Sequence, residues 1–362
     1  MLALMLLSGL VACESENAEV CKGKAGVFWY QESDVYLGMV REALNRELDK
    51  ANVEYTNYFA EGNQSKQIDQ IKTAIADGAT LLIVNQVTSG SLETAENIMM
   101  IAGDIPVIFF NRPIGSEANP DPAFYEQYEN TCFIGTDAPE AGHMQGKMIG
   151  TYVLSHFESL DLNGDGYISY AMLKGDEENV EAIFRTLYSV SDANRILAAS
   201  GRPSLRYFDS SKTKRERYQV DPNGAWSAEA AKAFMDRNLI FCSEKKNNMI
   251  ELVICNNDDM AEGAVAALQE KGYNIENSRY IPVFGVDATA TAQALIANQS
   301  MTGTVKQDSQ GMALAIRQTA EGILSGFTPG EALDRLVDSR FSRADDSGSK
   351  LYIAYTPYME EE

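Results

Sequence analysis

Short apolar segments alternate with longer amphipathic segments along almost the whole chain from residue 25 onward. The short segments are rich in Val, Ile and aromatic residues, whereas the longer ones repeat apolar residues at helical spacing. Strands that are apolar throughout and alternate with helices are typical of parallel sheets covered on both faces. The pattern therefore predicts an α/β fold with two doubly wound, Rossmann-like domains of five strands each. The predicted strands are 25–30, 53–59, 80–84, 106–110, 132–135, 168–173, 205–209, 250–255, 281–285 and 302–305. The predicted helices lie near 35–50, 65–77, 89–102, 138–156, 179–198, 225–237, 259–271, 289–297 and 309–324.

Residues at the ends of several predicted helices support these boundaries. Asn63 and Asp258 stand where an N-cap side chain accepts a hydrogen bond from the first turn. Gly78 and Gly272 stand where a helix commonly ends in a left-handed residue. The length of 362 residues is sufficient for two domains of ordinary size.

The residues that directly follow the predicted strands are unusually polar. Ligands of doubly wound sheets bind beyond the carboxyl ends of the strands, so these residues are candidates for a binding site. Most are Asp, Asn or Gln, whose planar groups make directional hydrogen bonds. The chain has only two histidines, His143 and His156, and neither follows a strand. We therefore infer recognition of a neutral polyol rather than catalysis. The polar residues are Gln31 to Asp34, Asn111, Arg112, Asn256 to Asp258, Asp287, Gln307 and Asp308.

Two aromatic residues stand near these strand ends. Tyr36 follows Asp34 by two positions at a predicted helix start, and Trp226 precedes another predicted helix. An aromatic ring can stack on the C–H face of a pyranose, and it can equally well pack in a core. The residues alone favour a core position for Trp226 and leave both interpretations open for Tyr36.

The charge balance excludes some classes of partner. The chain has 52 acidic and 30 basic residues, which gives a net charge of −22. Such a field repels nucleic-acid phosphates and anionic lipid headgroups. We therefore expect neutral or cationic partners and no nucleic acid, although solubility alone would explain the charge equally well.

The first residues resemble a bacterial lipoprotein signal. The apolar stretch MLALMLLSGLVAC ends in small residues and Cys13, at which cleavage would leave a thiol for lipid attachment. The alternative is an ordinary signal peptide with a chance cysteine; the stretch is too short to span a bilayer. Residues 1–23 are thus predicted to be a signal and a polar tether, with lipid as the only membrane contact. The remaining cysteines, Cys21, Cys132, Cys242 and Cys255, have no zinc-ligand spacing, and no disulfide is predicted.

Residues 161–170 read DLNGDGYISY and match most of a calcium-binding loop. The sharp turn at position 6 has the required Gly166, but position 12, which should be a bidentate Glu, is Met172. Either the loop binds nothing, or a distant carboxylate completes it. The candidate oxygen ligands within the loop are Asp161, Asn163, Asp165, the carbonyl of Tyr167 and the hydroxyl of Ser169.

Several segments together resemble the periplasmic galactose/glucose-binding proteins of bacterial ABC importers. The resemblance runs from about residue 25 to 325 and implies a type I periplasmic binding protein, whose two doubly wound lobes are joined by three hinge segments. It implies an N-terminal lobe of 24–135 plus 307–351 and a C-terminal lobe of 136–306 plus 352–362. The matching segments are Asp34 with Tyr36, NQSKQIDQIKTAIADGATLLIVN (63–85), IPVIFFNRP (105–113), FIGTD (133–137), the calcium loop followed by MLKG (172–175), ELVICNNDDMAEGAV (251–265) and IPVFGVDA (281–288).

The resemblance also assigns residues to a sugar site. It places Trp226 and Tyr36, the latter where the family has Phe, at the two stacking positions. Three positions depart from the family: Asn179 stands for His, Glu181 for Asp and Gln307 for a hinge Asn. These changes bear on which hexose is preferred. The hydrogen-bonding positions of the family are matched by Asp34, Asn111, Arg185, Asn257 and Asp287.

The expected function is a monomeric, non-enzymatic receptor outside the cytoplasm that delivers D-glucose or D-galactose to a membrane ABC permease. Presentation to a chemoreceptor is a further expected role. For the calcium loop, the resemblance implies that Glu251 supplies the last ligand of a structural Ca²⁺ site, with Ser169 in place of a longer Gln. The alternatives are a receptor for a pentose or signalling furanose, a sugar-acting enzyme using Asp34 and Asp287, and the sensing half of a repressor.

Overall fold

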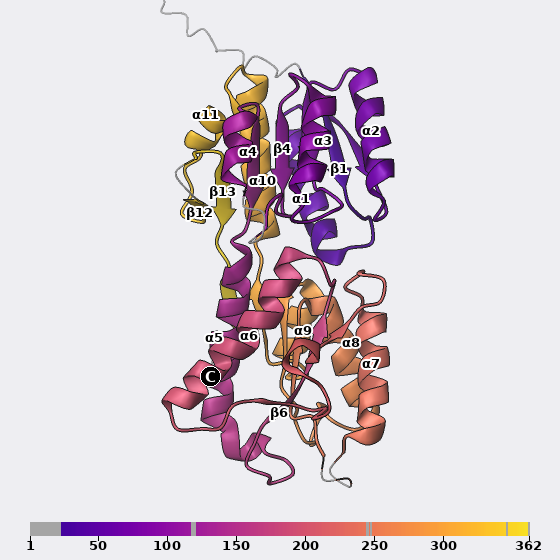
Figure 1. Cartoon of the computed structure of the whole chain (residues 1–362), viewed down its shortest axis with the longest axis vertical. Helices are drawn as coiled ribbons and strands as arrows, with labels where there is room; N and C mark the ends of the chain where they lie inside the picture. The colour runs from indigo at the N-terminus through magenta and orange to yellow at the C-terminus, as the bar shows by residue number, and fades with distance from the viewer. Residues whose placement is uncertain (1–22, 117–120, 244–245, 247, 345–346, 361–362) are drawn as a thin grey trace, which may run out of the picture.

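The computed structural model describes residues 23–116, 121–243, 246, 248–344 and 347–360. The described chain forms two lobes that lie end to end, each built on one largely parallel sheet with helices on both faces (Figure 1). The predicted fold of two doubly wound α/β domains is therefore confirmed. Cys13 and Cys21, and the signal and tether predicted for residues 1–23, lie outside the described residues except for Gly23.

The first lobe has a seven-stranded sheet of order β12-β13-β5-β4-β3-β1-β2, in which only the β12–β13 pair is antiparallel. Helices α1 and α10 contact each other on one face, and α2 and α3 contact each other on the opposite face. Its strands are β1 (Lys24–Trp29), β2 (Glu54–Phe59), β3 (Leu81–Val84), β4 (Val107–Phe110), β5 (Thr131–Gly135), β12 (Phe341–Arg343) and β13 (Lys350–Ile353). Its helices are α1 (Val35–Lys50), α2 (Gln64–Ala76), α3 (Leu92–Ala102), α4 (Pro122–Gln127), α10 (Ser309–Leu324) and α11 (Pro329–Asp334).

The second lobe has a sheet of order β14-β11-β10-β9-β6-β7, and β8 also pairs with β6. Only β14 runs antiparallel to its neighbour. Helices α5 and α6 cover one face, and α7 and α8 cover the other. Its strands are β6 (Ser169–Lys174), β7 (Arg206–Tyr207), β8 (Gln219–Val220), β9 (Leu252–Cys255), β10 (Val283–Asp287), β11 (Gly303–Lys306) and β14 (Thr356–Met359). Its helices are α5 (Ala138–Leu160), α6 (Val180–Ala199), α7 (Ala228–Phe241), α8 (Asp258–Glu270), α9 (Ala290–Ala297) and the short 3₁₀ helix η1 (Lys214–Glu216).

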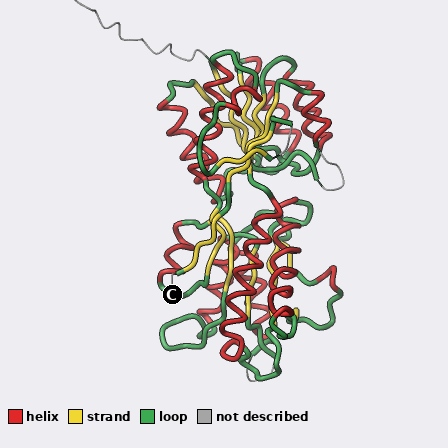
Figure 2. The backbone as a smooth tube through the Cα atoms, turned by 90° about the vertical axis from the view of Figure 1, so that its left-hand side faces the viewer, coloured by secondary structure: helices red, strands yellow, loops and turns green. Residues whose placement is uncertain are grey.

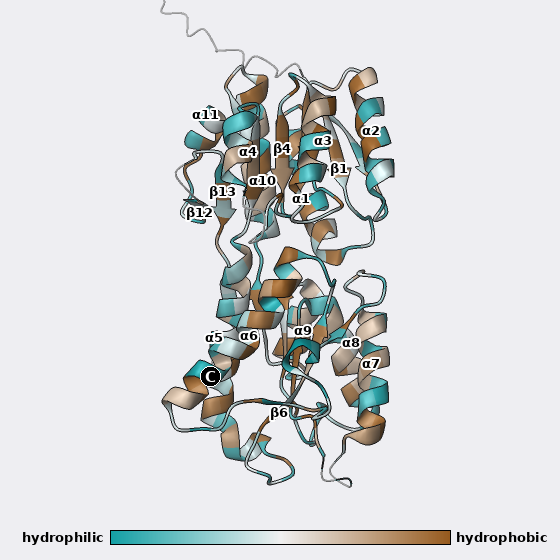
Figure 3. Ribbon diagram, viewed as in Figure 1, coloured by the Kyte–Doolittle hydropathy of each residue, from teal (hydrophilic) through white to brown (hydrophobic). Residues whose placement is uncertain are grey.

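The central strands are buried on both faces, which explains their continuous apolar sequence. In β1, Val27 and Trp29 enter the core beneath α1 and α10, whereas Phe28 enters the core beneath α2 and α3. Figure 3 shows the same division, with apolar strands such as β4 inside helices that carry mixed polar and apolar faces. Cys132 in β5 and Cys255 in β9 are fully buried free thiols, as their apolar surroundings predict.

The chain passes between the lobes at three places, which the tube view shows as parallel connections (Figure 2). The crossings follow β5, β11 and β13, where residues 136–137, 307–308 and 354–355 link one lobe to the other. Consequently each lobe is assembled from separate stretches of sequence. Among the described residues, no helix is both long and apolar enough to span a membrane.

Several sequence expectations need correction. Each sheet has more than five strands, because the first sheet also contains β12 and β13 and the second also contains β8 and β14. These four strands are short and contain polar residues, so the apolar pattern did not detect them. The strand predicted at 205–209 is reduced to the two residues of β7. The N-cap of α8 is Asn257 rather than Asp258, which is the first helical residue. The predicted N-cap at Asn63 is confirmed, since its side chain accepts from the Lys66 amide.

Candidate functional site

A pocket lies between the lobes, where the carboxyl ends of the strands of both sheets face each other. All ten residues that the sequence assigned to a sugar site line it, although 273 residues separate the first from the last. The pocket is small, with about 380 Å³ of free space. Its lining residues are Tyr30, Asp34, Tyr36, Leu37, Asn111, Arg112, Asn179, Glu181, Arg185, Trp226, Asn257, Asp287 and Gln307.

Three of these side chains are helix N-caps, which explains their fixed positions. Asp34 accepts from the Leu37 amide at the start of α1, at 2.8 Å. Asn179 and Asn257 cap α6 and α8 in the same way, at 3.1 and 3.0 Å. Three helix N-termini, with their partial positive charge, therefore point toward the pocket and favour electron-rich ligand oxygens.

Three other lining residues have an uncommon backbone conformation. Asn111, Trp226 and Asp287 have φ values of 59°, 58° and 127°. Such conformations cost free energy for residues other than glycine, and they concentrate at functional sites. Here they direct an amide, an indole and a carboxylate into the space between the lobes.

Arg185 lies at the centre of the polar contacts. It is 2% exposed, and its Nη1 donates to the Asn256 carbonyl at 2.9 Å while its Nη2 donates to Gln307 Oε1 at 3.1 Å. Glu181, one turn earlier on α6, lies 3.6 Å from the same Nη2. Burial lowers the pKa of Arg185, but Glu181 and the other acidic neighbours together outweigh this and raise the pKa above its ordinary value, so the guanidinium stays charged.

Hydrogen-bonding capacity inside the pocket is left unused. The Nε of Arg112, the Nε of Arg185 and the Nε2 of Gln307 are buried donors without an acceptor among the described residues. An unpaired buried donor costs roughly 1–3 kcal/mol, so these three nitrogens call for a ligand with acceptor oxygens. Asp287 is buried as well, and burial raises the pKa of its carboxyl well above the ordinary value. A hydroxyl of a ligand can accept from the three unpaired nitrogens, and it can also form a hydrogen bond with the Asp287 carboxyl.

Tyr36 and Trp226 form aromatic walls of the pocket. Both are nearly buried, at 6% and 7% exposure. The Tyr36 hydroxyl turns away from the pocket toward the Met312 sulfur, 3.8 Å away, so only its ring surface is available. Trp226 lies against Gly175, and the Arg185 guanidinium is 5.7 Å from its ring centroid. Both aromatic residues therefore belong to the pocket, including Trp226, for which the residues alone favoured a core position.

The sequence did not identify Tyr30 and Leu37 as site residues, and it named Arg112 only as a polar residue after a strand, not as part of the sugar site. The Tyr30 hydroxyl donates to Asp34 Oδ2 at 2.8 Å and thus orients that carboxylate. Arg112 stacks over the Tyr30 ring and pairs with Asp176 of the other lobe at 3.8 Å. Tyr30 directly follows β1 in the structure, so the strand-end rule that named Asp34, Asn111 and Arg112 could have found it as well.

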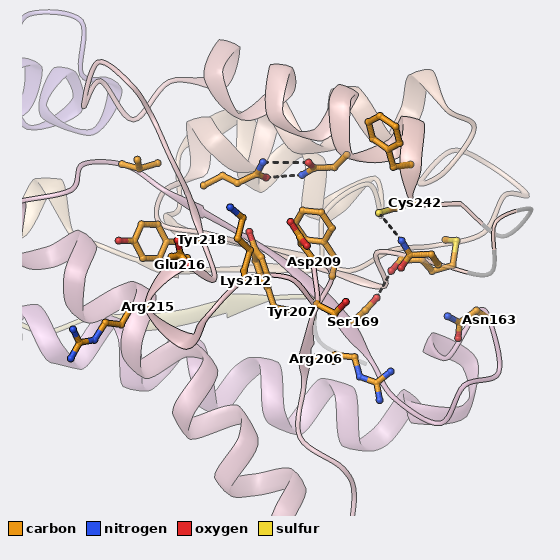
Figure 4. Close-up of a pocket in the computed structure, with 18 of the residues that line it drawn as sticks. Asn163, Ser169, Arg206, Tyr207, Asp209, Lys212, Arg215, Glu216, Tyr218 and Cys242 are labelled. Atoms are coloured by element: carbon orange, nitrogen blue, oxygen red, sulfur yellow. Dashed lines mark hydrogen bonds between the residues drawn. The ribbon is translucent and has the colours of Figure 1, made fainter.

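A much larger open basin lies on the second lobe, around β7 and η1, with about 2010 Å³ of free space (Figure 4). Several of its charged groups already have partners: Arg206 pairs with Asp165, Glu216 accepts from Thr213, and Glu177 accepts from the Tyr218 hydroxyl. No lining side chain of the basin is a buried polar group without a partner among the described residues. The small pocket between the lobes is therefore the better candidate site.

The loop at residues 161–169 has the turns of a cation-binding loop. The carboxylate of Asp161 accepts from the amides of Asp165 and Gly166, at 3.0 and 2.9 Å. Asn163 Oδ1 also accepts from the Asp165 amide, at 3.0 Å. These contacts arrange the polar side chains around one turn at the far end of the second lobe from the pocket.

Glu251 reaches this loop from the start of β9, some eighty residues later in the sequence. Its Oε1 accepts from the Leu162 amide at 2.8 Å, and its Oε2 accepts from the Ser169 amide at 2.9 Å. The carboxylate is 1% exposed and has no cationic side chain as partner among the described ion pairs. Burial is the main cause that raises its pKa, which is the behaviour of a carboxylate lacking a counter-charge.

Other features of the loop differ from a finished metal site. The Ser169 hydroxyl donates to the Met249 carbonyl, and Arg206 stacks over the Tyr167 ring while pairing with Asp165. Within the described part of the chain, no three His, Cys, Asp or Glu side chains lie close enough together to hold a metal ion. The oxygen ligands of the loop are of the kind that calcium prefers. To bind one calcium ion together, the carboxylates of Asp161 and Asp165 would have to move closer to that of Glu251.

The family model for the periplasmic binding protein domain matches residues 25–326 of the chain. This chain belongs to that family. The resemblance seen in the sequence is thereby confirmed. The chain is 30% identical over 320 residues to the D-galactose/methyl-galactoside binding periplasmic protein MglB of Haemophilus influenzae, and the alignment covers 87% of each protein.

Solved structures of binding proteins share the fold. An ABC transporter solute-binding protein from Bacillus halodurans with bound myo-inositol has a TM-score of 0.66 at 18% identity, covering 94% of this chain and 96% of that one. One from Clostridium phytofermentans with bound β-D-glucose has a TM-score of 0.65 at 18% identity, covering 93% and 94%. At these identities the likeness establishes the fold alone.

Proposed function

We propose that the protein is an extracytoplasmic receptor that captures a monosaccharide between its lobes and delivers it to a membrane ABC permease. The family membership supports the receptor role, and the relatives are described as binding proteins rather than enzymes. The proposed sugar is D-glucose or D-galactose, which the relationship to a galactose-binding protein supports.

The observation that carries the proposal is the pocket's unmet hydrogen-bonding capacity between two aromatic walls. Buried donors of Arg112, Arg185 and Gln307 have no acceptor among the described residues, and the carboxyl of Asp287, whose pKa burial raises, lines the same pocket. A pyranose supplies hydroxyls that do both, and it offers C–H faces to Tyr36 and Trp226. The ten predicted residues would thus act together: Asp34, Asn111, Asn179, Glu181, Arg185, Asn257, Asp287 and Gln307 by hydrogen bonds, Tyr36 and Trp226 by stacking.

Binding would be coupled to closure of the lobes. Asp34, Tyr36 and Asn111 come from the first lobe, whereas Arg185 and Asn257 come from the second. A ligand that contacts both sets binds the closed arrangement better and shifts the population toward it. The closed form is the one a permease, or a chemoreceptor, would recognise.

Calorimetry with a panel of hexoses, pentoses, myo-inositol and disaccharides tests the proposal. We expect saturable 1:1 binding of at least one hexose, and loss of that binding in Asp34→Ala. The matched control is Asp77→Ala, an exposed carboxylate that follows α2 and lies outside the pocket. If neither glucose nor galactose gave a binding signal, the proposed sugar would be wrong. Binding of a pentose or of myo-inositol would then identify the ligand instead. Hydrolysis of aryl glycosides would instead indicate an enzyme.

We further propose that Ca²⁺ binds the loop with Asp161, Asn163, Asp165, Tyr167, Ser169 and Glu251 as ligands and stabilises the second lobe. The buried, cation-free carboxylate of Glu251 supports this proposal. We expect EDTA to lower the melting temperature and calcium to restore it, with no response in Glu251→Gln. The exposed Glu270→Gln of the same lobe should respond like the unaltered protein. A melting temperature indifferent to EDTA and calcium would contradict the proposal.

Lipid attachment at Cys13 is the proposed means of retention at the membrane. The apolar residues before Cys13 support it. Metabolic labelling with a fatty acid should mark the full chain and leave Cys13→Ser unmarked.

A further inference from the structure

Each of the three crossings between the lobes places one polar side chain at the same buried point. Thr136 follows β5, Gln307 follows β11 and Tyr355 precedes β14. All three are 2–3% exposed. A polar side chain at such depth normally has a hydrogen-bond partner, so the partners of these three show what the crossings are connected to.

The three side chains are joined through two pocket residues of α6. The Tyr355 hydroxyl lies 2.9 Å from Thr136 Oγ1, and it accepts from Arg185 Nη2 at 3.4 Å. The same Nη2 donates to Gln307 Oε1 at 3.1 Å. Glu181 closes the circuit, because its Oε1 accepts from the Thr136 hydroxyl at 3.4 Å. One hydrogen-bonded network therefore links all three crossings to Glu181 and Arg185.

Only part of this network lines the pocket. Arg185, Glu181 and Gln307 do, whereas Thr136 and Tyr355 do not. Burial raises the pKa of the Tyr355 hydroxyl well above its ordinary value, so this group stays a neutral donor. A ligand that accepts from the unpaired Arg185 Nε therefore binds a guanidinium whose Nη2 is held by residues of two crossings, Gln307 and Tyr355.

The network can be complete only over a narrow range of angles between the lobes. Bending at the crossings changes the backbone dihedrals of residues 136, 307 and 355, and so moves their side chains relative to α6. In this structure the lobes also meet beside the pocket, through Arg112 and Asp176. The intact network therefore accompanies the arrangement in which the lobes are together.

We propose that the Tyr355 hydroxyl is a positioning group that couples the angle between the lobes to the pocket, by holding Thr136 and Arg185 together only when the lobes are closed. The inference rests on the proposed monosaccharide-binding function, since it concerns how that same pocket is assembled. Removing the hydroxyl should favour the open arrangement without removing any atom that touches the ligand.

The test compares Tyr355→Phe with Thr136→Val, which removes the other end of the same hydrogen bond while keeping its shape. The matched control is Tyr280→Phe, because Tyr280 makes a similar 2.8 Å contact with Thr302 at the opposite end of the second sheet. Calorimetry with the hexose that the unaltered protein binds gives the affinity, and X-ray scattering with and without that hexose gives the radius of gyration.

We expect Tyr355→Phe and Thr136→Val each to weaken binding by about fivefold to tenfold, as the loss of about one hydrogen bond predicts. Each should also enlarge the radius of gyration of the sugar-free protein. The double variant should lose less affinity than the two single losses multiplied together, because both substitutions remove the same contact between Thr136 and Tyr355. Tyr280→Phe should keep the unaltered affinity and radius.

Unchanged affinity in both variants would overturn the inference, and so would an equal loss in Tyr280→Phe. If one variant fails to fold, the other still decides. If the unaltered protein binds no monosaccharide, the proposed function fails, and the scattering of the sugar-free proteins then tests the inference by itself. Equal radii for Tyr355→Phe and the unaltered protein would overturn it.

Discussion

Gly175→Ala tests whether Trp226 is a rigid wall of the pocket. Gly175 follows β6, and a Cβ added to it would lie 2.1 Å from Trp226 Cδ2 and 2.2 Å from Cε3. Contacts this short cannot exist, and an indole ring cannot bend out of the way as a flexible chain end would. Since Gly175 has no left-handed φ, the substitution acts through this contact alone. The ring must move, and the pocket wall moves with it.

The magnitude follows from the cost of overpacking, which is typically about 1–3 kcal/mol. If the overpacking destabilises the sugar-bound state by this amount relative to the sugar-free state, hexose affinity drops by about fivefold to more than a hundredfold. Calorimetry measures the loss. The emission of Trp226 should shift as well, while Trp29, the only other tryptophan, is fully buried in the first lobe and should not contribute to the change.

Gly38→Ala is the matched control. It lies in α1, and an added Cβ would have no atom within 4 Å. The alanine should stabilise the helix by about 1 kcal/mol and leave affinity and emission unchanged. Unaltered affinity and emission in Gly175→Ala would refute the view that the position of Trp226 defines the site.

Two further predictions concern the charges of Asp259 and Asp176, neither of which lines the pocket itself. Burial raises the pKa of Asp259 to about 7, so the folded protein binds more protons than the unfolded one between about pH 4 and 7, and its stability falls as pH rises through that window. The melting temperature of Asp259→Asn should therefore fall less steeply between about pH 4 and 7 than that of the unaltered protein. An equally steep fall would contradict the raised pKa of Asp259. Asp176→Asn removes the ion pair with Arg112 across the lobes, and should weaken hexose affinity by about twofold to fivefold at low salt and less at high salt. An effect independent of salt would exclude an electrostatic cause.

The strand-end rule predicted much of the site because of the fold's geometry. Asp34, Asn111, Asn257 and Asp287 each follow or end a strand of a parallel sheet, and such sheets bring these ends to one edge. The local sequence pattern was therefore enough to predict those site residues that lie at the end of a predicted strand.

Other parts could not be predicted from the pattern of residues. Arg185 and Glu181 lie within α6, where they look like surface residues, and only the family resemblance singled them out. The network through Thr136 and Tyr355 joins positions 219 residues apart, so it becomes visible only in the folded chain. The strands β12 and β13 were not predicted for a different reason, since polar residues such as Arg343 and Lys350 interrupt their apolar pattern.

A crystal structure of the protein with its best-binding monosaccharide tests the central claim most directly. The account predicts one pyranose between the lobes, with its oxygens within hydrogen-bonding distance of Arg185 Nε and Gln307 Nε2, and with its ring faces against Tyr36 and Trp226. A sugar bound in the basin beside β7, or a pocket between the lobes that stays without sugar at saturating concentration, would contradict it.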